Sequence, residues 1–319
     1  MIANTLEPPY TAVRMPSVSN AVLDAIVARH RLRVDGPIVP VESAGVVHAL
    51  WRLGSKLLLR VPKDEEMCVA DHRCEAVAIP LAIDAGVRTP RFVLFDDSLQ
   101  LLPVPFSVVE YIDGKNHISL QPIDGHYQRT YEQLGEQLAL LHRATVPSSA
   151  HPWLRIPGDA PAEAFFDEVV AAGLLHVDGV EWFREVCNRL DEAIGAGSPP
   201  RVLLHNDLKP DNVMLDVSRD VHLIDWGDCG YGDPADDFHA LPMRAIQPTL
   251  RGYRSTTIGD RSLEARIVRV VIARSLSGLR RTPFLGPSWY RPIAATLTDL
   301  LTFAIDEPST WNEWTKNES

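Results

Sequence analysis

Two short polar segments of this 319-residue chain carry side chains that could perform chemistry together. Asp207 and Asn212 lie in the polar part of the segment His205–Leu215. Asp225 follows directly after the apolar run Val221–Ile224. Both segments adjoin apolar runs that read as strands, so we expect two adjacent loops to bring the three side chains together. Carboxylate and carbonyl oxygens are the ligands that Mg²⁺ prefers in proteins.

This set of side chains fits phosphoryl transfer. A bound metal neutralises the phosphate charge, while a separate carboxylate orients the attacking hydroxyl and accepts its proton. We therefore assign Asp207 as the base and Asn212 and Asp225 as Mg²⁺ ligands. The alternative is a polar hairpin loop whose Asp and Asn side chains only cap turns. Any one residue would fit that alternative, but the joint pattern HxDxxxxN, followed thirteen residues after Asn212 by Asp225, favours phosphoryl transfer.

Two further side chains of the same loop are candidates for supporting roles. Lys209 lies two residues after Asp207 and could meet the γ-phosphate as a point charge. The alternative for Lys209 is a solvated loop lysine. His205 is expected to brace the loop rather than to react.

The motifs that follow this loop carry a resemblance to a known family. His205–Leu215, Ile224–Trp226 and Gly232–Phe238 resemble the HxDxxxxNxL, IDW and GDPxxDL motifs of the aminoglycoside phosphotransferase and choline kinase family. The last motif reads GDPADDF here, with Asp237 at the Asp position and Phe238 in place of the usual Leu. The resemblance implies a protein-kinase-like fold, and it implies that Asp237 braces the catalytic loop.

A weaker resemblance lies upstream. Leu134–His142, which reads LGEQLALLH, is similar to the LGxxLAxLH helix of the same family. It implies that His142 is a packed structural histidine. It also places a helix over residues 127–142, where Leu134, Leu138 and Leu141 form one apolar stripe.

Hydrophobic patterning divides the chain into two different halves. The first half predicts strands over residues 37–41, 46–53, 56–61, 89–94 and 106–111, with helices over residues 21–30 and 65–85. Asp113-Gly114 is expected to turn the chain. The second half predicts helices over residues 127–142, 162–175, 180–194, 262–280 and 291–305. We expect an α+β fold with an N-terminal nucleotide-binding sheet lobe, residues 1–112, and a mainly helical catalytic and substrate-binding lobe, residues 113–319.

In the first lobe, a kinase-like site needs a phosphate-covering loop and a cation held by a helix glutamate. The resemblance implies that Ser43 and Gly45 lie over the phosphates, although a single glycine there also fits an ordinary turn. Arg60, at the end of its strand, is the candidate cation and Glu75 its partner. Lys63 competes with Arg60, but Pro62 is expected to end the strand first.

The junction of the two lobes is predicted near residues 110–112. By resemblance, the family's hinge falls at Glu110–Ile112, where backbone groups would contact adenine. Side chains are poor predictors of such a contact.

Bulk composition excludes several classes. The net charge of −11 argues against nucleic acid as a partner. No apolar run reaches the length of a membrane helix, and Met1–Tyr10 does not resemble a signal peptide, so we expect no membrane partner and a cytoplasmic protein. The four cysteines form no CxxC pair and are expected to be free thiols. The sequence leaves open whether the protein is a monomer or a homodimer.

The resulting expectation is an ATP- and Mg²⁺-dependent kinase of a small hydroxyl-bearing substrate, for instance an antibiotic, with GTP as a possible donor. A protein kinase is the first alternative. Against it, only seven residues separate Asp225 from Asp233 and no Ala-Pro-Glu follows, although a peptide-binding activation segment needs more length. A nucleotide-binding pseudoenzyme is the second alternative, and the intact Asp207, Asn212 and Asp225 argue against it.

The charge of the acceptor stays open at this stage. Six carboxylates could line a cleft for a polycationic substrate: Glu163, Asp167, Glu168, Asp228, Asp233 and Asp236. Residues 250–292 instead carry nine arginines, which would suit a neutral or anionic substrate. Helical spacing predicts that Arg266, Arg269 and Arg280 lie on a largely exposed face, where they would be a solvated stripe.

Overall fold

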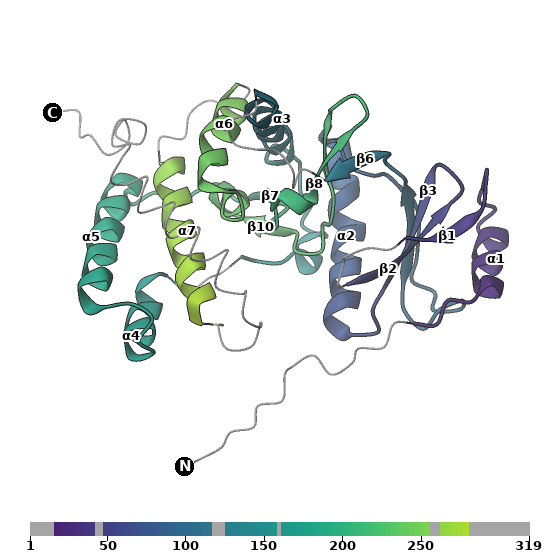
Figure 1. The fold of residues 1–319 in the computed structure, drawn as a ribbon, viewed down its shortest axis with the longest axis horizontal. Coiled ribbons are helices and arrows are strands. Elements are labelled where there is room, and N and C mark those ends of the chain that lie inside the picture. The colour runs from purple at the N-terminus through teal and green to yellow at the C-terminus, as the bar shows by residue number, and fades with distance from the viewer. Residues whose placement is uncertain (1–15, 42–46, 117–124, 158–160, 256–261, 281–319) are drawn as a thin grey trace, which may run out of the picture.

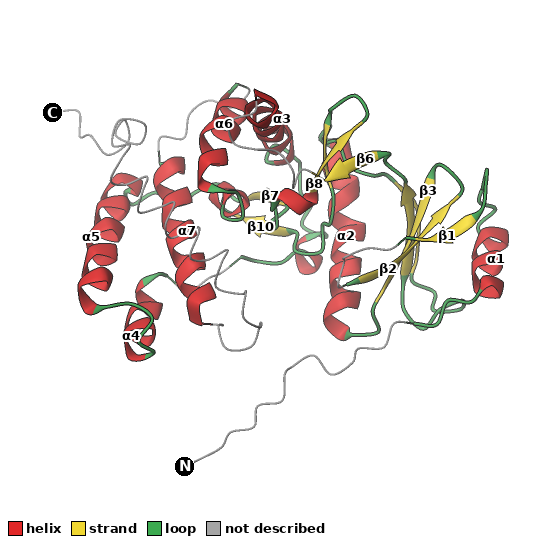
Figure 2. Ribbon diagram, viewed as in Figure 1, coloured by secondary structure: helices red, strands yellow, loops and turns green. Residues whose placement is uncertain are grey.

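The computed structural model describes residues 16–41, 47–116, 125–157, 161–255 and 262–280. Helix α2 stands between a twisted sheet and a larger, mainly helical part of the molecule (Figure 1). The largest sheet lies on one side of α2, and most of the helices, together with short strands, lie on the other, as Figure 2 shows. The predicted α+β class is confirmed. The predicted helix over residues 291–305 and the loop with Ser43 and Gly45 lie outside the described residues.

The N-terminal sheet has five antiparallel strands in the order β1-β2-β3-β5-β4. Helix α1 begins after Ser19, whose side chain accepts a hydrogen bond from the Val22 N–H and so caps the helix. Leu59 and Val108, which face each other on β3 and β5, are fully buried in a core that also includes Ile26 of α1. The bounds are α1 Asn20–Arg29, β1 Ile38–Pro40, β2 His48–Leu53, β3 Leu57–Pro62, α2 Glu66–Asp84, β4 Phe92–Asp96 and β5 Phe106–Glu110.

The second part is built around a larger apolar core. Helices α3 and α6 pack so closely that a Cβ at Gly135 would clash with the Thr249 carbonyl and one at Gly252 with the Glu132 carbonyl. The glycine of the LGxxLAxLH pattern is thus explained by helix packing. The bounds are β6 Gly114–Asn116, α3 Gly125–Leu141, α4 Glu163–Ala171, α5 Val177–Ile194, β7 Val202–Leu204, β8 Val213–Asp216, β9 Val221–Leu223, β10 Gly230–Gly232, α6 Met243–Arg254 and α7 Leu263–Arg280.

Two expectations are wrong, and one helix is unexpected. Gly114 does not simply turn the chain but begins β6, which pairs with β8. Helix α6 is not predicted from the sequence, because Pro248 interrupts the pattern that a helix normally shows. Cys74 and Cys229 are bonded as a disulfide, with a Cα–Cα distance of 6.6 Å, whereas Cys68 and Cys187 are free as predicted.

Within the described residues, no helix is both long enough and apolar enough to cross a membrane.

Candidate active site

The strand pair β8–β9 explains why Asn212 and Asp225 lie together. Val213 of β8 is the register partner of Leu223 of β9. One step further along, the Ile224 N–H donates to the Asn212 carbonyl over 3.0 Å. Asn212 immediately precedes one strand and Asp225 closely follows the other, so the ladder brings both residues to the same end of the hairpin. The sequence-based expectation of two adjacent loops agrees with this geometry.

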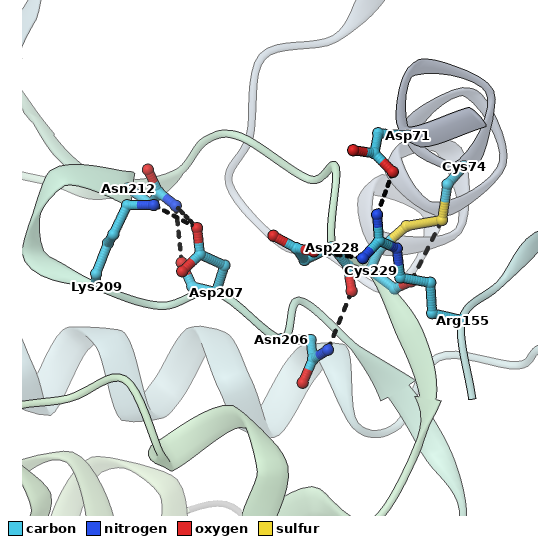
Figure 3. A network of polar contacts seen from close by, with 9 residues as sticks. All are labelled: Asp71, Cys74, Arg155, Asn206, Asp207, Lys209, Asn212, Asp228 and Cys229. Carbon is cyan, nitrogen blue, oxygen red and sulfur yellow. Dashed lines mark hydrogen bonds and ion pairs between the residues drawn. A yellow bond between two sulfur atoms is a disulfide. The ribbon is translucent and has the colours of Figure 1, made fainter. Parts of the chain in front are cut away.

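Asp207 is tied to two other residues of its loop (Figure 3). Its Oδ2 accepts from Lys209 Nζ at 2.6 Å and from Asn212 Nδ2 at 2.8 Å. Asn212 Nδ2 also lies 2.8 Å from the Asp207 carbonyl oxygen. Asn212 is buried, whereas the Asp207 side chain keeps 23% of its surface exposed. The carboxylate is therefore oriented from one side and still accessible to a substrate.

The donor set suits a hard divalent cation. The amide nitrogen of Asn212 is engaged with Asp207, so its carbonyl oxygen faces away from that carboxylate. Asp225 is exposed and has a positive φ of 64°, a conformation that Asp tolerates better than most residues. An amide oxygen and a carboxylate from two adjacent strand ends match the all-oxygen coordination of Mg²⁺. The residues present thus fit the metal that the sequence implies.

Asp237 holds the backbone of the loop that carries Asp207. It is fully buried, and its carboxylate accepts from the Asn206 N–H at 2.5 Å and the His205 N–H at 3.2 Å. His142 Nε2 lies 2.9 Å from the same carboxylate, and His142 Nδ1 lies 3.0 Å from the Tyr253 hydroxyl. His142 is therefore a packed histidine, and Asp237 holds the loop, as the resemblance implies.

His205 braces the loop from the other side. It is fully buried, and its Nε2 lies 3.0 Å from the Ile224 carbonyl, immediately before Asp225. Burial lowers the pKa of His205 against the opposing effect of Asp237. The imidazole ring of His205 therefore links the loop that carries Asp207 to the segment that carries Asp225.

Replacing Asp237 with alanine is expected to lower the free energy of unfolding by about 3–5 kcal/mol, because buried N–H donors lose their acceptor. Chemical denaturation measures this quantity. The matched control is Asp211→Ala, which removes an exposed carboxylate from the catalytic loop itself and should change stability by less than about 0.5 kcal/mol. Equal stability of the two variants would show that Asp237 does not hold the loop.

Arg60 and Glu75 form the predicted pair between β3 and α2. Arg60 Nη1 lies 2.5 Å and Nη2 2.9 Å from the two Glu75 oxygens, and Glu75 is fully buried. Burial raises the pKa of Glu75 to about 7, although Arg60 acts in the opposite direction. Burial alone would lower the pKa of Arg60, but Glu75 and, to a smaller extent, Asp225 raise it.

A buried histidine pair lies against Glu75. His48 Nε2 and His72 Nδ1 are 3.0 Å apart, and His72 Nδ1 is 3.7 Å from a Glu75 oxygen. Burial, and then Arg60, lower the pKa of His72 to about 3 and that of His48 well below its usual value. His48, His72 and Glu75 are residue types that bind metal ions, and their ligand atoms lie within 4.8 Å of one another. Here both Glu75 oxygens already serve Arg60, so the neutral histidines pack beside the ion pair.

Three further residues considered for the nucleotide site are Glu110, Ile112 and Lys63. Glu110 ends β5 and Ile112 lies just beyond it, between the N-terminal sheet and β6. The N–H groups of Glu110 and Tyr111 donate to the carbonyls of Arg91 and Lys56. Contact of this segment with a base stays a prediction. Lys63 follows the end of β3, so Arg60 is the cation that the structure pairs with Glu75.

Sequence reasoning missed a set of residues between α2 and the segment after Asp225. Arg155 donates to Asp71 of α2 and, over 2.7 Å, to Asp228 (Figure 3). Asn206 Nδ2 donates to the Asp228 carbonyl over 3.2 Å. Arg155 lies in a proline-rich stretch with no recognisable motif, so only the three-dimensional arrangement reveals its position.

The prediction that Arg266 and Arg269 face solvent is wrong. Arg266 is 6% exposed and donates to Asp233 over 2.7 Å. Arg269 donates to Glu163 over 2.8 Å and to Asp191 over 3.0 Å. Both arginines are held between α7 and neighbouring elements because carboxylates stand opposite them. The side chain of Arg280 lies outside the described residues.

Comparisons with known proteins address the family and the fold of the chain. The model of the phosphotransferase enzyme family (APH) matches residues 45–261. No curated protein sequence matches the chain significantly. Among solved structures, a choline/ethanolamine kinase family protein from Mesorhizobium loti aligns with a TM-score of 0.58 and 18% identity, covering 92% of this chain and 98% of that one.

Two antibiotic phosphotransferases align similarly. The GDP complex of wild-type aminoglycoside 2′-phosphotransferase-IIIa gives a TM-score of 0.63 and 15% identity, covering 89% of this chain and 99% of that one. Macrolide 2′-phosphotransferase MphH from Brachybacterium faecium gives 0.60 and 19%, covering 87% and 97%. At these identities the likeness shows the fold alone, and the predicted kinase-like fold is confirmed.

Proposed function

The chain belongs to the phosphotransferase enzyme family, and from this premise we propose that it transfers the γ-phosphate of ATP to a hydroxyl group of a small molecule. The observation that carries the proposal is the position of Asp207. Its carboxylate is oriented by Lys209 and Asn212, and Asn212 adjoins the segment that carries Asp225. A base beside two metal ligands is what phosphoryl transfer requires.

In this proposal Asp207 accepts the proton of the acceptor hydroxyl as the hydroxyl oxygen attacks the γ-phosphorus. The bond from this phosphorus to the β,γ-bridging oxygen breaks, and ADP leaves. Asn212 Nδ2 keeps the carboxylate oriented toward the acceptor. Lys209 donates a hydrogen bond to Asp207 in the structure. During the reaction its ammonium group would meet the transferred phosphoryl group as a point charge. Asp237 acts only by holding the backbone of the loop.

Asn212 and Asp225 would hold Mg²⁺, which neutralises phosphate charge when it is bound. Arg60 would contact the nucleotide phosphates, and Glu75 would keep Arg60 in place. Ser43 and Gly45 are proposed to cover the phosphates, and the backbone at Glu110 and Ile112 to meet the base. The lobe boundary is proposed between residues 112 and 113.

The segment after Asp225 supports a small-molecule acceptor over a protein. It leads directly into β10, which pairs with β7, and then into the turn that contains Asp237. A peptide substrate would need a longer activation segment here. ATP is the proposed donor, and GTP is an alternative because three structural neighbours are GDP complexes.

Ion pairs between carboxylates and arginines in this part of the molecule affect which charge of acceptor substrate is favoured. Asp228, Asp233 and Glu163 are each bonded to an arginine, which reduces the negative charge that they offer to a polycation. This favours neutral or singly charged hydroxyl compounds, such as macrolide-like antibiotics, sugars or amino alcohols, over polycationic aminoglycosides.

A screen for acceptor-dependent ADP release tests the proposal. Purified protein with Mg²⁺ and either ATP or GTP is incubated with aminoglycosides, macrolides, amino alcohols and sugars, and nucleotide release is coupled to an optical signal. We expect at least one acceptor to raise the rate above the acceptor-free rate. Protein that binds nucleotide but shows no acceptor-dependent release with any compound would instead be a pseudoenzyme.

Replacing Arg60 with alanine is expected to raise the KM for nucleotide about 10- to 100-fold, because a charged phosphate contact contributes about 1.5–3 kcal/mol. Lys63→Ala should change this KM by less than about threefold, and Arg60→Lys should fall between the two. Steady-state kinetics with the acceptor at saturation measures the effect. A larger increase for Lys63→Ala than for Arg60→Ala would assign the phosphate contact to Lys63.

A further inference from the structure

A covalent bond joins the two elements that carry the nucleotide-binding groups. Cys74 precedes Glu75 in α2, and Cys229 lies four residues after Asp225. Their disulfide links positions that are 155 residues apart in the sequence. Both cysteines are buried, with 4% and 0% of their surface exposed. The bond therefore fixes the helix that holds Arg60 to the loop that carries Asp225.

Non-covalent contacts align the same two elements. Arg155 bridges Asp71, one turn before Cys74, and Asp228, the neighbour of Cys229 (Figure 3). The Arg155 N–H donates to the Cys229 carbonyl over 3.2 Å. Arg155 and Asp228 keep 40% and 47% of their side-chain surface exposed. Because exposed ion pairs are weak, these contacts contribute little to the stability of the interface between α2 and the loop.

The two elements are also in direct contact. A Cβ at Gly227 would lie 3.4 Å from the Cβ of Asp71 and 3.8 Å from a Glu75 oxygen. These are ordinary van der Waals distances, so the backbone at Gly227 lies against α2. Movement of α2 would change the position of Arg60 relative to Asp225, because Glu75 holds Arg60 with two hydrogen bonds.

We propose that the Cys74–Cys229 pair is a thiol–disulfide modification site that sets the affinity for magnesium nucleotide, by fixing or releasing α2 against the loop after Asp225. This inference rests on the proposed function. The disulfide form holds the Arg60–Glu75 pair in the arrangement described above. Reduction leaves only the exposed ion pairs and packing to hold it, and the affinity falls.

The chemistry requires a dithiol reductant and an oxidant of the peroxide class. One thiolate of the dithiol attacks a protein sulfur and forms a mixed disulfide, and its second thiol then displaces that sulfur. The dithiol becomes a disulfide, and the protein gains two electrons and two protons as two thiols. Hydrogen peroxide reverses the change: the two thiols lose two electrons and two protons, the S–S bond forms and peroxide becomes two waters.

Burial of Cys74 and Cys229 limits the access of a reductant to their sulfur atoms. A reductant reaches the sulfurs only when α2 separates from the loop, because both cysteines are covered in the closed arrangement. Magnesium nucleotide held between Arg60 and Asp225 opposes that separation. By reciprocity, a ligand that binds the bonded form more tightly shifts the thiol–disulfide equilibrium toward the bonded form.

The test compares oxidised and reduced protein without needing an acceptor. Peroxide-treated and dithiol-treated samples are mapped by mass spectrometry of non-reduced peptides, and magnesium ATP binding is measured by calorimetry. We expect a linked Cys74–Cys229 peptide in the oxidised sample only. We expect the Kd of reduced wild-type protein to be at least about fivefold higher than that of the oxidised form.

Variants separate the switch from general effects of thiol reagents. Cys74→Ser and Cys229→Ser should both show the weaker affinity and no response to either reagent. Cys68→Ser and Cys187→Ser remove the two free buried cysteines and should respond like the wild type. The wild-type comparison needs no substitution, so it stands even if a variant does not fold.

Two results would overturn the inference. One is the absence of the linked peptide after peroxide treatment. The other is an unchanged Kd between samples whose mapping shows the bond formed in one and open in the other. Nucleotide binding in neither state would contradict the proposed function itself, and the switch would fall with it.

Discussion

Replacing Asp207 with asparagine is expected to reduce kcat about a thousandfold while the Kd for magnesium nucleotide stays within about threefold of wild type. A positioned base contributes about 10²–10⁴-fold to the rate, and the amide of asparagine cannot accept the hydroxyl proton at neutral pH. Asparagine keeps an oxygen for Lys209 and Asn212, so the loop should retain its shape. Single-turnover kinetics with the acceptor found in the screen, together with calorimetry, measures the two quantities.

The matched control is Asp211→Asn, which changes an exposed carboxylate four residues away in the same loop. This control should turn over at nearly the wild-type rate. Near-normal turnover of Asp207→Asn would exclude Asp207 as the base. A loss of nucleotide binding equal to the loss of rate would instead indicate that Asp207 contributes to binding rather than to proton transfer.

Replacing Asp225 with asparagine should weaken magnesium-dependent nucleotide binding, unlike the replacement of Asp207. We expect the Mg²⁺ concentration for half-maximal nucleotide binding to rise at least about 100-fold, because losing even a residue outside the coordination shell costs metal sites about 10–100-fold in affinity. A magnesium titration of nucleotide binding measures this change. Turnover should fall with it, and added Mg²⁺ should partly restore both.

Asp220→Asn serves as the control for this prediction. Asp220 lies just before β9, whereas Asp225 lies after it, so the two residues stand at opposite ends of the β8–β9 hairpin. Replacement of Asp220 should leave the magnesium titration of nucleotide binding unchanged. An unaltered magnesium titration of Asp225→Asn would remove Asp225 from the metal site, while the Asp207 assignment would still stand.

The site is predictable from sequence where local pattern and topology coincide. Apolar runs on either side of a polar loop predict strands, and strands that follow each other along the chain commonly pair, so the amino-acid pattern already places Asn212 beside Asp225. The Arg60–Glu75 pair is predicted instead from the family resemblance, which implies a strand cation held by a helix glutamate. The pair forms because Arg60 of β3 and Glu75 of α2 face each other where the helix packs beside the sheet.

The parts that sequence reasoning misses depend on long-range packing. Helical spacing correctly groups Arg266 and Arg269, but it cannot show that Asp233 and Glu163 stand opposite them. The Cys74–Cys229 bond likewise joins two elements whose proximity no local pattern encodes. Helix α6 escapes prediction because Pro248 lowers helix propensity, while its packing against α3 stabilises it.

The most direct test of the account is the fate of the γ-phosphate. ATP labelled on its γ-phosphate is incubated with Mg²⁺, the wild-type protein and the acceptor from the screen, and the product is analysed by mass spectrometry and label counting. We predict that the acceptor gains one labelled phosphoryl group in amounts equal to the ADP formed, and that Asp207→Asn forms almost none. Label released only as inorganic phosphate, or equal product with Asp207→Asn, would contradict the account.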